Sequence, residues 1–395
     1  MSRPRLLLSF SGGLDTSYCV VNLSDRYDVS TVTFDCGGLD DAERAHIAER
    51  SRATGAVSHT LLDLREELCQ RILVPLLRTG YLKGENYPLC VGAERGLQAA
   101  HLARLANEGG FDAVGHGCTA AGNDQVRFDV TLRALLNPGI HIEAPIRDQG
   151  PSREESAAAL ELIGIHTPPR LTTYSVNTSL WGTTMGGGPL HDPSKPVPTD
   201  LRHRVLAASQ VEADDRDVTI GFVQGAPVSI DGQTMPMPAL IEALDALGAE
   251  HGLGRDVHCG DTVLGIKGRI LFEAPAALLL HRAHLDLDKL VLSKQQLYLR
   301  QHLLPLYGQL LHEGFWLDPV MRDVEAYFAS EQRHTTGEVV LRLGKGTLEL
   351  VSVTTPHNRM RGKARYGETG SGWDGRDTDG FAKILALSLL SGSRG

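Results

Sequence analysis

Residues 9–17, SFSGGLDTS, combine two glycines, an aspartate and four hydroxyl side chains directly after an apolar run. Gly12 and Gly13 permit close backbone approach, and Ser11, Thr16 and Ser17 offer short hydroxyl donors. If a helix begins here, its free amides and its dipole favour an anion. The stretch is therefore either a phosphate-binding loop or an ordinary strand-to-helix turn. Asp15 would repel a polyphosphate unless a cation intervenes, so we expect it to be a helix cap or to face magnesium.

A second polar stretch, GHGCTAAGNDQVRFD at residues 115–129, follows another apolar segment. Asn123, Asp124, Gln125 and Arg127 stand closer together than in most ordinary loops, although a surface ion pair is the plainer alternative. The forked guanidinium of Arg127 suits a carboxylate. The stretch therefore predicts a second part of one binding site.

Alternating strands and helices must position these stretches. The expected strands are 5–10, 28–35, 57–64, 111–117 and 142–148, and the expected helices are 16–25, 41–54, 65–78, 93–107 and 152–164. Such alternation predicts an α/β fold with a doubly wound parallel sheet. Ligands bind at the carboxyl ends of strands in such sheets, where both glycine-rich stretches would lie.

The remaining chain is expected to be α+β, with hairpins at 217–232 and 337–353, a strand-rich segment at 261–275, and helices at 238–252 and 285–313. A TPPR segment and the glycine-rich run 182–189 follow the helix at 152–164, and we place a domain boundary near 165–170. We predict a nucleotide-binding domain at 1–167, a substrate domain at 168–365 and a helical arm at 366–395. The apolar arm requires a partner surface, which favours a homo-oligomer.

Composition narrows the function further. The 395 residues carry a net charge of −9, which argues against a nucleic-acid surface. No apolar run approaches a membrane span. The six cysteines show no zinc spacing and are typical of a cytosolic protein with reduced thiols, so no protein-held metal is expected.

The first motif resembles the pyrophosphate loop of the ATP pyrophosphatase (adenine nucleotide alpha hydrolase-like) superfamily. Together, SGGLDTS and GNDQVRF resemble argininosuccinate synthase. The similarity continues in order through YP at 87–88, YSVNTSLWG at 174–182, GPLHDP at 188–193, GIKGRILFEAP at 265–275, AHLDLDKLVLSKQ at 283–295 and GFWLDP at 314–319. It covers nearly the whole chain.

The resemblance implies a cytoplasmic, AMP-forming ligase of arginine biosynthesis that acts as a homotetramer, or as a dimer if the short arm fails. A ureido oxygen of citrulline attacks the α-phosphorus of ATP, with Mg²⁺ present, and the amine of aspartate then displaces AMP. The implied catalytic residues are Asp15, Asp124 and Arg127. The implied ATP contacts are Ser9, Phe10, Ser11, Gly12, Gly13, Leu14, Asp15, Thr16, Ser17, Phe34 and Gly117. Aspartate would contact Thr119, Asn123 and Asp124, and citrulline would contact Tyr87, Asn123, Arg127, Ser175 and Thr184.

The sequence departs from the family pattern around the acceptor. Hydroxyl residues of the family are replaced by Val91 and Gly92, two glutamates by Gly186 and Gly260, a tyrosine by Phe272 and a lysine by Ala121.

Three explanations stay open for these departures. Asp261, Asp217 or Glu273 compensates, citrulline binds differently, or the acceptor is an N-acylated citrulline or another ureido or carboxamide compound. Two other functions also stay open. They are a catalytically inactive nucleotide-binding regulator, and another ATP pyrophosphatase such as a tRNA thiolase using Cys36 and Cys118.

Overall fold

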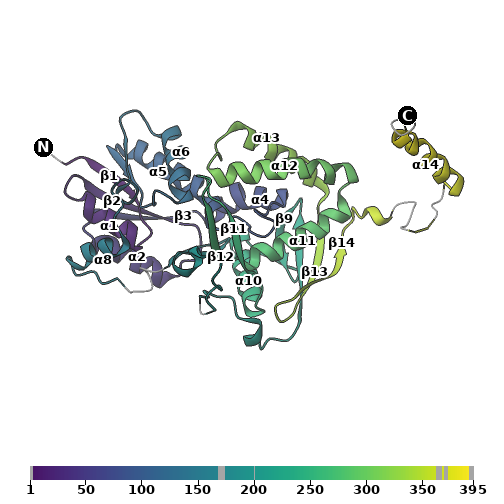
Figure 1. Cartoon of the computed structure of the whole chain (residues 1–395), viewed down its shortest axis with the longest axis horizontal. Helices are drawn as coiled ribbons and strands as arrows, with labels where there is room; N and C mark the ends of the chain where they lie inside the picture. The colour runs from purple at the N-terminus through teal and green to yellow at the C-terminus, as the bar shows by residue number, and fades with distance from the viewer. Residues whose placement is uncertain (1–2, 168–173, 200, 362–366, 369–371, 391–395) are drawn as a thin grey trace.

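A five-stranded parallel sheet forms the first half of the chain (Figure 1). The computed structural model describes residues 3–167, 174–199, 201–361, 367–368 and 372–390. The sheet order is β3 (Ser58–Asp63), β2 (Asp28–Asp35), β1 (Arg5–Ser9), β4 (Ala113–Gly115) and β5 (His141–Glu143). Its longer helices are α1 (Leu14–Leu23), α2 (Asp41–Ala53), α5 (Arg95–Gly109), α6 (Asn123–Leu135) and α8 (Arg153–Glu161). The predicted parallel α/β fold is confirmed, and its order reverses beside β1, where β4 is the other neighbour.

Local sequence explains these elements. Leu6, Leu7 and Leu8 are all buried, as expected for a central parallel strand covered on both faces. Ser152 and Glu155 form a capping box at the start of α8. The strand predicted at 142–148 is wrong in its second half, because Pro145 begins the short helix α7 (Pro145–Gln149).

Two antiparallel sheets form the second half. The four-stranded sheet has the order β11 (Arg255–Asp261), β12 (Lys267–Glu273), β7 (Gly182–Gly186) and β6 (Ser175–Ser179). The five-stranded sheet has the order β10 (Gln233–Thr234), β9 (Ala226–Ile230), β8 (Arg216–Val223), β13 (Gly337–Leu343) and β14 (Leu348–Thr354). The hairpins predicted at 217–232 and 337–353 are present, and the glycine-rich run at 182–189 begins with the strand β7.

The helices of this half are α10 (Met237–Glu250), α11 (Pro275–Val291), α12 (Lys294–Glu313), α13 (Pro319–Glu331) and α14 (Gly375–Leu390). Shorter helical turns are η2 (Val91–Glu94), η3 (Gly188–His191), η4 (Ala208–Gln210), η5 (Gln332–His334) and η6 (Arg359–Arg361). None of the described helices combines the length and apolar character needed to cross a membrane.

Residues 65–79 cross from the first half into the second. They form α3 (Arg65–Leu68), a π-helical turn η1 (Cys69–Leu73) and α4 (Val74–Thr79). Helix α4 contacts α11, α12 and α13, and Figure 1 shows it among the helices of the second half. One apolar core therefore contains residues of both halves. Half of the boundary predicted near 165–170, residues 168–170, lies outside the described residues.

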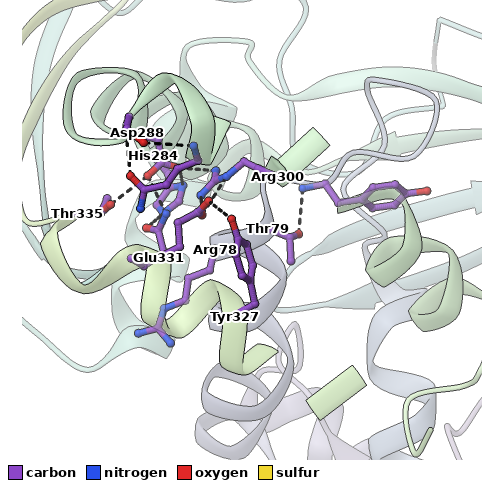
Figure 2. Close-up of polar contacts among 12 residues, drawn as sticks. Arg78, Thr79, His284, Asp288, Arg300, Tyr327, Glu331 and Thr335 are labelled. Atoms are coloured by element: carbon purple, nitrogen blue, oxygen red, sulfur yellow. Dashed lines mark hydrogen bonds and ion pairs between the residues drawn. The ribbon is translucent and has the colours of Figure 1, made fainter. Parts of the chain in front are cut away.

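A buried polar network joins α11, α12 and α13 (Figure 2). Asp288 accepts hydrogen bonds from Arg300 Nη1 at 2.5 Å and Gln332 Nε2 at 2.8 Å, and lies 3.1 Å from His284 Nδ1. The other side of the Arg300 guanidinium holds Glu331 at 2.5 Å. Burial alone would raise the pKa of Asp288, but His284 and Arg300 outweigh it and lower the pKa to about 2. Arg300 of α12 therefore holds α11 through Asp288 and α13 through Glu331.

Candidate active site

A cavity of about 1280 Å³ lies where the carboxyl ends of the parallel strands meet the four-stranded antiparallel sheet. It is lined by most of the predicted site residues: Ser9, Phe10, Ser11, Gly13, Leu14, Asp15, Thr16, Phe34, Tyr87, Gly117, Thr119, Asn123, Asp124, Arg127, Ser175 and Thr184. Gly12 and Ser17 are not in its wall. The two glycine-rich stretches therefore meet at one site, as their positions after β1 and β4 predict.

The SGGLDTS loop joins β1 to α1 and presents the start of that helix to the cavity. Gly13 is the N-cap residue and supplies no side-chain cap. Ser11 Oγ lies 3.2 Å from Thr16 Oγ1, so the two hydroxyls form one cluster at the helix start. Amides at an uncapped helix N-terminus and adjacent hydroxyls are suited to binding phosphate oxygens.

Gly12 and Ser17 support this loop from behind. Gly12 has φ +74°, and a Cβ there would lie 2.9 Å from Ile47 Cγ1 on α2. Ser17 is fully buried and accepts a hydrogen bond from Arg50 Nε at 3.1 Å. Both residues were predicted to contact ATP directly. Neither lines the cavity, and their observed contacts are with Ile47 and Arg50 on α2.

Asp15 is not the helix cap that was one of its two expected roles, because Gly13 is the N-cap residue and Asp15 lies in the first turn of α1. Burial raises the pKa of Asp15, while Arg153, 3.9 Å away, acts in the opposite direction. Among the described residues, no group of three or more acidic, histidine or cysteine side chains could hold a metal ion. A single carboxylate beside a phosphate loop fits magnesium that arrives on a nucleotide, which is often held by one or two carboxylates.

The second polar stretch forms the loop between β4 and α6. A Cβ at Gly117 would lie 3.0 Å from Thr16 Cγ2, so the absence of a side chain lets the two loops touch. Asp124 lies in the first turn of α6, and Thr119 is exposed in the loop before it. Asn123 Oδ1 accepts a hydrogen bond from Val263 N at 2.7 Å, which ties α6 to the connection between β11 and β12.

Asp124 and Arg127 belong to a larger charged cluster. Asp124 accepts hydrogen bonds from Arg95 Nε at 2.9 Å and from Arg127 Nη1 at 2.7 Å. Burial would raise the pKa of Asp124, but the two guanidinium groups outweigh it and lower the pKa. Arg127 also donates to the His312 carbonyl at 2.7 Å and contacts His312 Nδ1 at 2.9 Å. All three guanidinium nitrogens of Arg127 therefore have protein partners.

Two members of this cluster carry no local signal in the sequence. His312 lies on α12, 185 residues from Arg127, and only the fold brings them together. Glu94 is 2% exposed, and burial raises its pKa to about 7. Its carboxylate bonds with Ser179 Oγ, Gln98 Nε2 at 3.0 Å and Arg95 Nη1 at 3.2 Å. Glu94 thus connects the cluster to β6.

The predicted acceptor residues Tyr87, Ser175 and Thr184 line the same cavity as the phosphate loop. Tyr87 is buried and stacks on His258, with ring centroids 5.2 Å apart, and it also contacts Phe272. Ser175 and Thr184 lie on β6 and β7. Tyr87 is therefore both a packed aromatic residue and part of the cavity wall.

The three proposed compensating carboxylates are engaged elsewhere. Asp217 pairs with Arg342 Nε at 2.7 Å between β8 and β13, and does not line the cavity. Glu273 accepts hydrogen bonds from the backbone amides of residues 203–205. Asp261 lines the cavity, but its carboxylate pairs with Lys267 Nζ at 2.8 Å.

A close approach joins the nucleotide half to β6 and β7. Gly37 follows β2 with φ +92°, and a Cβ there would lie 2.6 Å from Leu180 Cβ and 2.9 Å from Leu180 N. The Leu180 amide donates to the Cys36 carbonyl at 2.9 Å. This junction sets the distance between the phosphate loop and the hairpin that carries Ser175 and Thr184.

The cysteines near the cavity are poor nucleophiles. Burial raises the pKa of Cys36 and of Cys118 well above the ordinary thiol value. Because the thiolate is the reactive form, this environment disfavours the sulfur chemistry of a thiolase.

Both halves of the chain match known proteins in sequence. A sequence profile described as "Arginosuccinate synthase N-terminal HUP domain" matches residues 5–165, and one described as "Arginosuccinate synthase C-terminal domain" matches residues 174–391. The chain is 36% identical over 393 residues to an argininosuccinate synthase from Xanthomonas campestris, covering 98% of each chain. It is 34% identical over 400 residues to one from Pyrobaculum aerophilum, covering 100% of this chain and 99% of the other.

Proposed function

Because the chain belongs to the argininosuccinate synthase family, we propose that it is a ligase that joins L-aspartate to the ureido carbon of citrulline. ATP is cleaved to AMP and pyrophosphate in the same reaction. The observation that carries this proposal is that one cavity is lined by the SGGLDTS loop, by Asp124 and Arg127, and by Tyr87, Ser175 and Thr184. Its walls can therefore hold a nucleotide, an amino acid and an acceptor together.

In the first step, the ureido oxygen attacks the α-phosphorus of ATP. A new oxygen–phosphorus bond forms, and the bond from the α-phosphorus to the pyrophosphate oxygen breaks. The amides at the start of α1 and the hydroxyls of Ser11 and Thr16 would hold the leaving pyrophosphate. Magnesium bound with the nucleotide, beside Asp15, would neutralise charge on the phosphates.

In the second step, the amine of aspartate attacks the ureido carbon, and AMP leaves with the former ureido oxygen. The lowered pKa of Asp124 keeps its carboxylate ionised, which supports a role in holding the ammonium group of aspartate. Thr119 and Asn123 are the other proposed aspartate contacts. Arg127 holds Asp124 and the end of α12 in place, and we propose that it also faces the acceptor.

The exposed apolar side chains of α14 support a homo-oligomer, and we propose a tetramer in a cytosolic setting. Phe381, Ile384 and Leu387 are each more than 60% exposed. Figure 1 shows α14 separate from the rest of the molecule. Light scattering after size-exclusion chromatography measures the mass, and a monomeric mass would contradict this part of the proposal.

A product analysis tests the reaction. The protein is incubated with ATP, magnesium, aspartate and citrulline labelled with ¹⁸O in the ureido group. We expect AMP and pyrophosphate in equal amounts, a product with the mass of argininosuccinate, and the label in AMP. The absence of aspartate-dependent AMP would contradict the proposal and favour an inactive nucleotide-binding regulator.

The substitution Asp124→Asn tests the role of Asp124 separately from the roles of the other site residues. Asp124→Asn keeps the shape but removes a charge-assisted hydrogen bond of about 1.5–3 kcal/mol, so kcat/KM for aspartate should fall by about 10- to 150-fold. ATP affinity, measured by calorimetry, should change little. An equal loss of ATP affinity would place Asp124 in the nucleotide site instead.

A further inference from the structure

One face of the four-stranded sheet forms the far wall of the cavity. His258 on β11 is paired in register with Ile270 on β12, and Gly260 is paired with Gly268. Thr184 is paired with Phe272, and Gly186 follows it on β7. All of these residues except Phe272 line the cavity, and none of them carries a negative charge.

Two imidazoles stand at this wall with an unused ring nitrogen. His258 and His312 are 8% and 5% exposed, and both line the cavity. Within the described part of the chain, Nε2 of each ring has no hydrogen-bond partner. Buried polar atoms are nearly always paired, so Nε2 of His258 indicates a group that binds here, whereas the ring of His312 also interacts with the Asp261 backbone.

The partner of His312 fixes which ring nitrogen carries its proton. Arg127 Nη2 lies 2.9 Å from His312 Nδ1, and a guanidinium can only donate. Nδ1 is therefore the acceptor, and Nε2 of the neutral ring is an N–H donor. Burial and the charges of Arg127 and Lys83 lower the pKa of His312 to about 3, although the Asp261 backbone acts in the opposite direction.

The charges that face this wall are also positive. Lys83 lines the cavity, and among the described residues its ammonium makes no ion pair or hydrogen bond. Among the described residues of this wall, Asp261 is the acidic side chain that lines the cavity, and it is paired with Lys267; the charge of Glu313 also acts on Lys83, but Glu313 does not line the cavity. The subsite therefore offers N–H donors and positive charge, and no unpaired carboxylate for an ammonium ion.

We propose that the subsite formed by Lys83, His258, His312 and the wall around Gly186 and Gly260 binds carboxylate or acyl oxygens of the acceptor. Its preferred acceptors are ureido acids whose amine is acylated or absent. This inference rests on the proposed function, because it concerns the acceptor of that reaction. A free ammonium group would face Lys83 and Arg127 without a counter-charge, so masking or removing it improves binding.

Three acceptors test the inference: citrulline, N-acetylcitrulline and 5-ureidopentanoate, which lacks the amine. Aspartate-dependent AMP formation gives kcat/KM for each. We expect at least one of the two amine-masked or amine-free compounds to exceed citrulline by tenfold or more. If neither exceeds citrulline by threefold, the inference is overturned and the proposed function stands. If no acceptor gives aspartate-dependent AMP, the proposed function fails and this inference fails with it.

A matched pair of variants tests the electrostatic cause. A Cβ at Gly186 would meet only Ile270 Cγ2, at 3.9 Å, so a larger side chain fits there. Gly186→Glu and Gly186→Gln have nearly the same shape and differ in charge. We expect the glutamate variant to shift the kcat/KM ratio toward citrulline by at least tenfold relative to the glutamine variant. Equal ratios in the two variants would overturn the inference, and thermal unfolding verifies that both are folded.

Discussion

Adding one methyl group at Gly37 should displace the acceptor side of the site relative to the nucleotide side. Gly37 follows β2, and its backbone lies against Leu180 at the turn between β6 and β7. The substitution Gly37→Ala would place a carbon 2.6 Å from Leu180 Cβ and 2.9 Å from two Leu180 backbone atoms. Carbon atoms prefer separations of about 3.5–4.0 Å, so the hairpin must move by about 1 Å.

Two costs add at this position. A non-glycine residue at φ +92° costs about 1–2 kcal/mol. Forcing an extra carbon into a close contact costs a further 1–3 kcal/mol or so. We therefore expect Gly37→Ala to lower the free energy of unfolding by about 2–5 kcal/mol.

Gly139→Ala is the matched control. Gly139 has a similar φ of +95°, but a Cβ there would meet no atom within 4 Å. This variant carries the backbone strain alone and should lose about 1–2 kcal/mol. Urea unfolding of both variants therefore separates the strain from the contact with Leu180.

The functional effect should be confined to the acceptor side. A displacement of about 1 Å at a reacting group can cost on the order of 10² in rate. We expect kcat/KM for the acceptor to fall about 100-fold in Gly37→Ala while ATP affinity stays within about threefold. If Gly37→Ala and Gly139→Ala match in both stability and kcat/KM, the junction does not set the geometry of the site.

Three further predictions concern single positions. Gly12→Ala should weaken ATP binding by more than tenfold in calorimetry, because φ is +74° and the methyl would meet Ile47 at 2.9 Å; unchanged affinity would contradict the role given to the loop. Asp288→Asn should cost about 3–5 kcal/mol at pH 7, because the buried Arg300 would keep Glu331 but lose the charge of Asp288. The pKa of Asp288 lies at about 2, below its unfolded value, so its stabilisation is present at neutral pH and lost as pH falls from about 5 to 2. Urea titrations at pH 3, 5 and 7 should show a smaller acid loss in the variant, and parallel curves would contradict this. Glu94→Gln should gain about 1–3 kcal/mol over the parent protein between pH 5 and pH 8. Burial raises the pKa of Glu94 from its usual 4.5 to about 7, so between these values the unfolded chain ionises Glu94 while the folded protein keeps it protonated, and the parent protein loses stability. Thermal unfolding at the two pH values measures the gain, and equal differences would refute it.

Local signals explain what the sequence predicts well. A run such as Leu6 to Leu8 followed by glycines and a helix start determines strand, turn and helix within a few residues, so the parallel sheet and both polar loops could be predicted. The hairpin at 175–186 was not predicted, because the glycines and threonines at 182–186 carry little local strand signal and their strand character comes from pairing with β6 and β12. The strand predicted at 142–148 was too long, because the strand β5 ends at Glu143 and Pro145 begins a helix directly after it.

Long-range contacts explain what the sequence could not give. Arg127 was predicted to suit a carboxylate, and its guanidinium is held by the Asp124 carboxylate and, without any local signal, by His312 from a distant helix. No local pattern places His258 against Tyr87 or Glu94 against Ser179. These side chains are determined by how the two halves meet.

The route of residues 65–79 means that the halves recognised by the two sequence profiles are not separate folding units. Leu73, Leu76 and Leu77 belong to the first half by sequence, yet they are buried in the core shared with α11, α12 and α13. A fragment ending at residue 165 would return these leucines to water, at about 1.5–3 kcal/mol each. The nucleotide half and the acceptor half should therefore unfold together in one cooperative transition, and neither should be soluble when it is produced without the other.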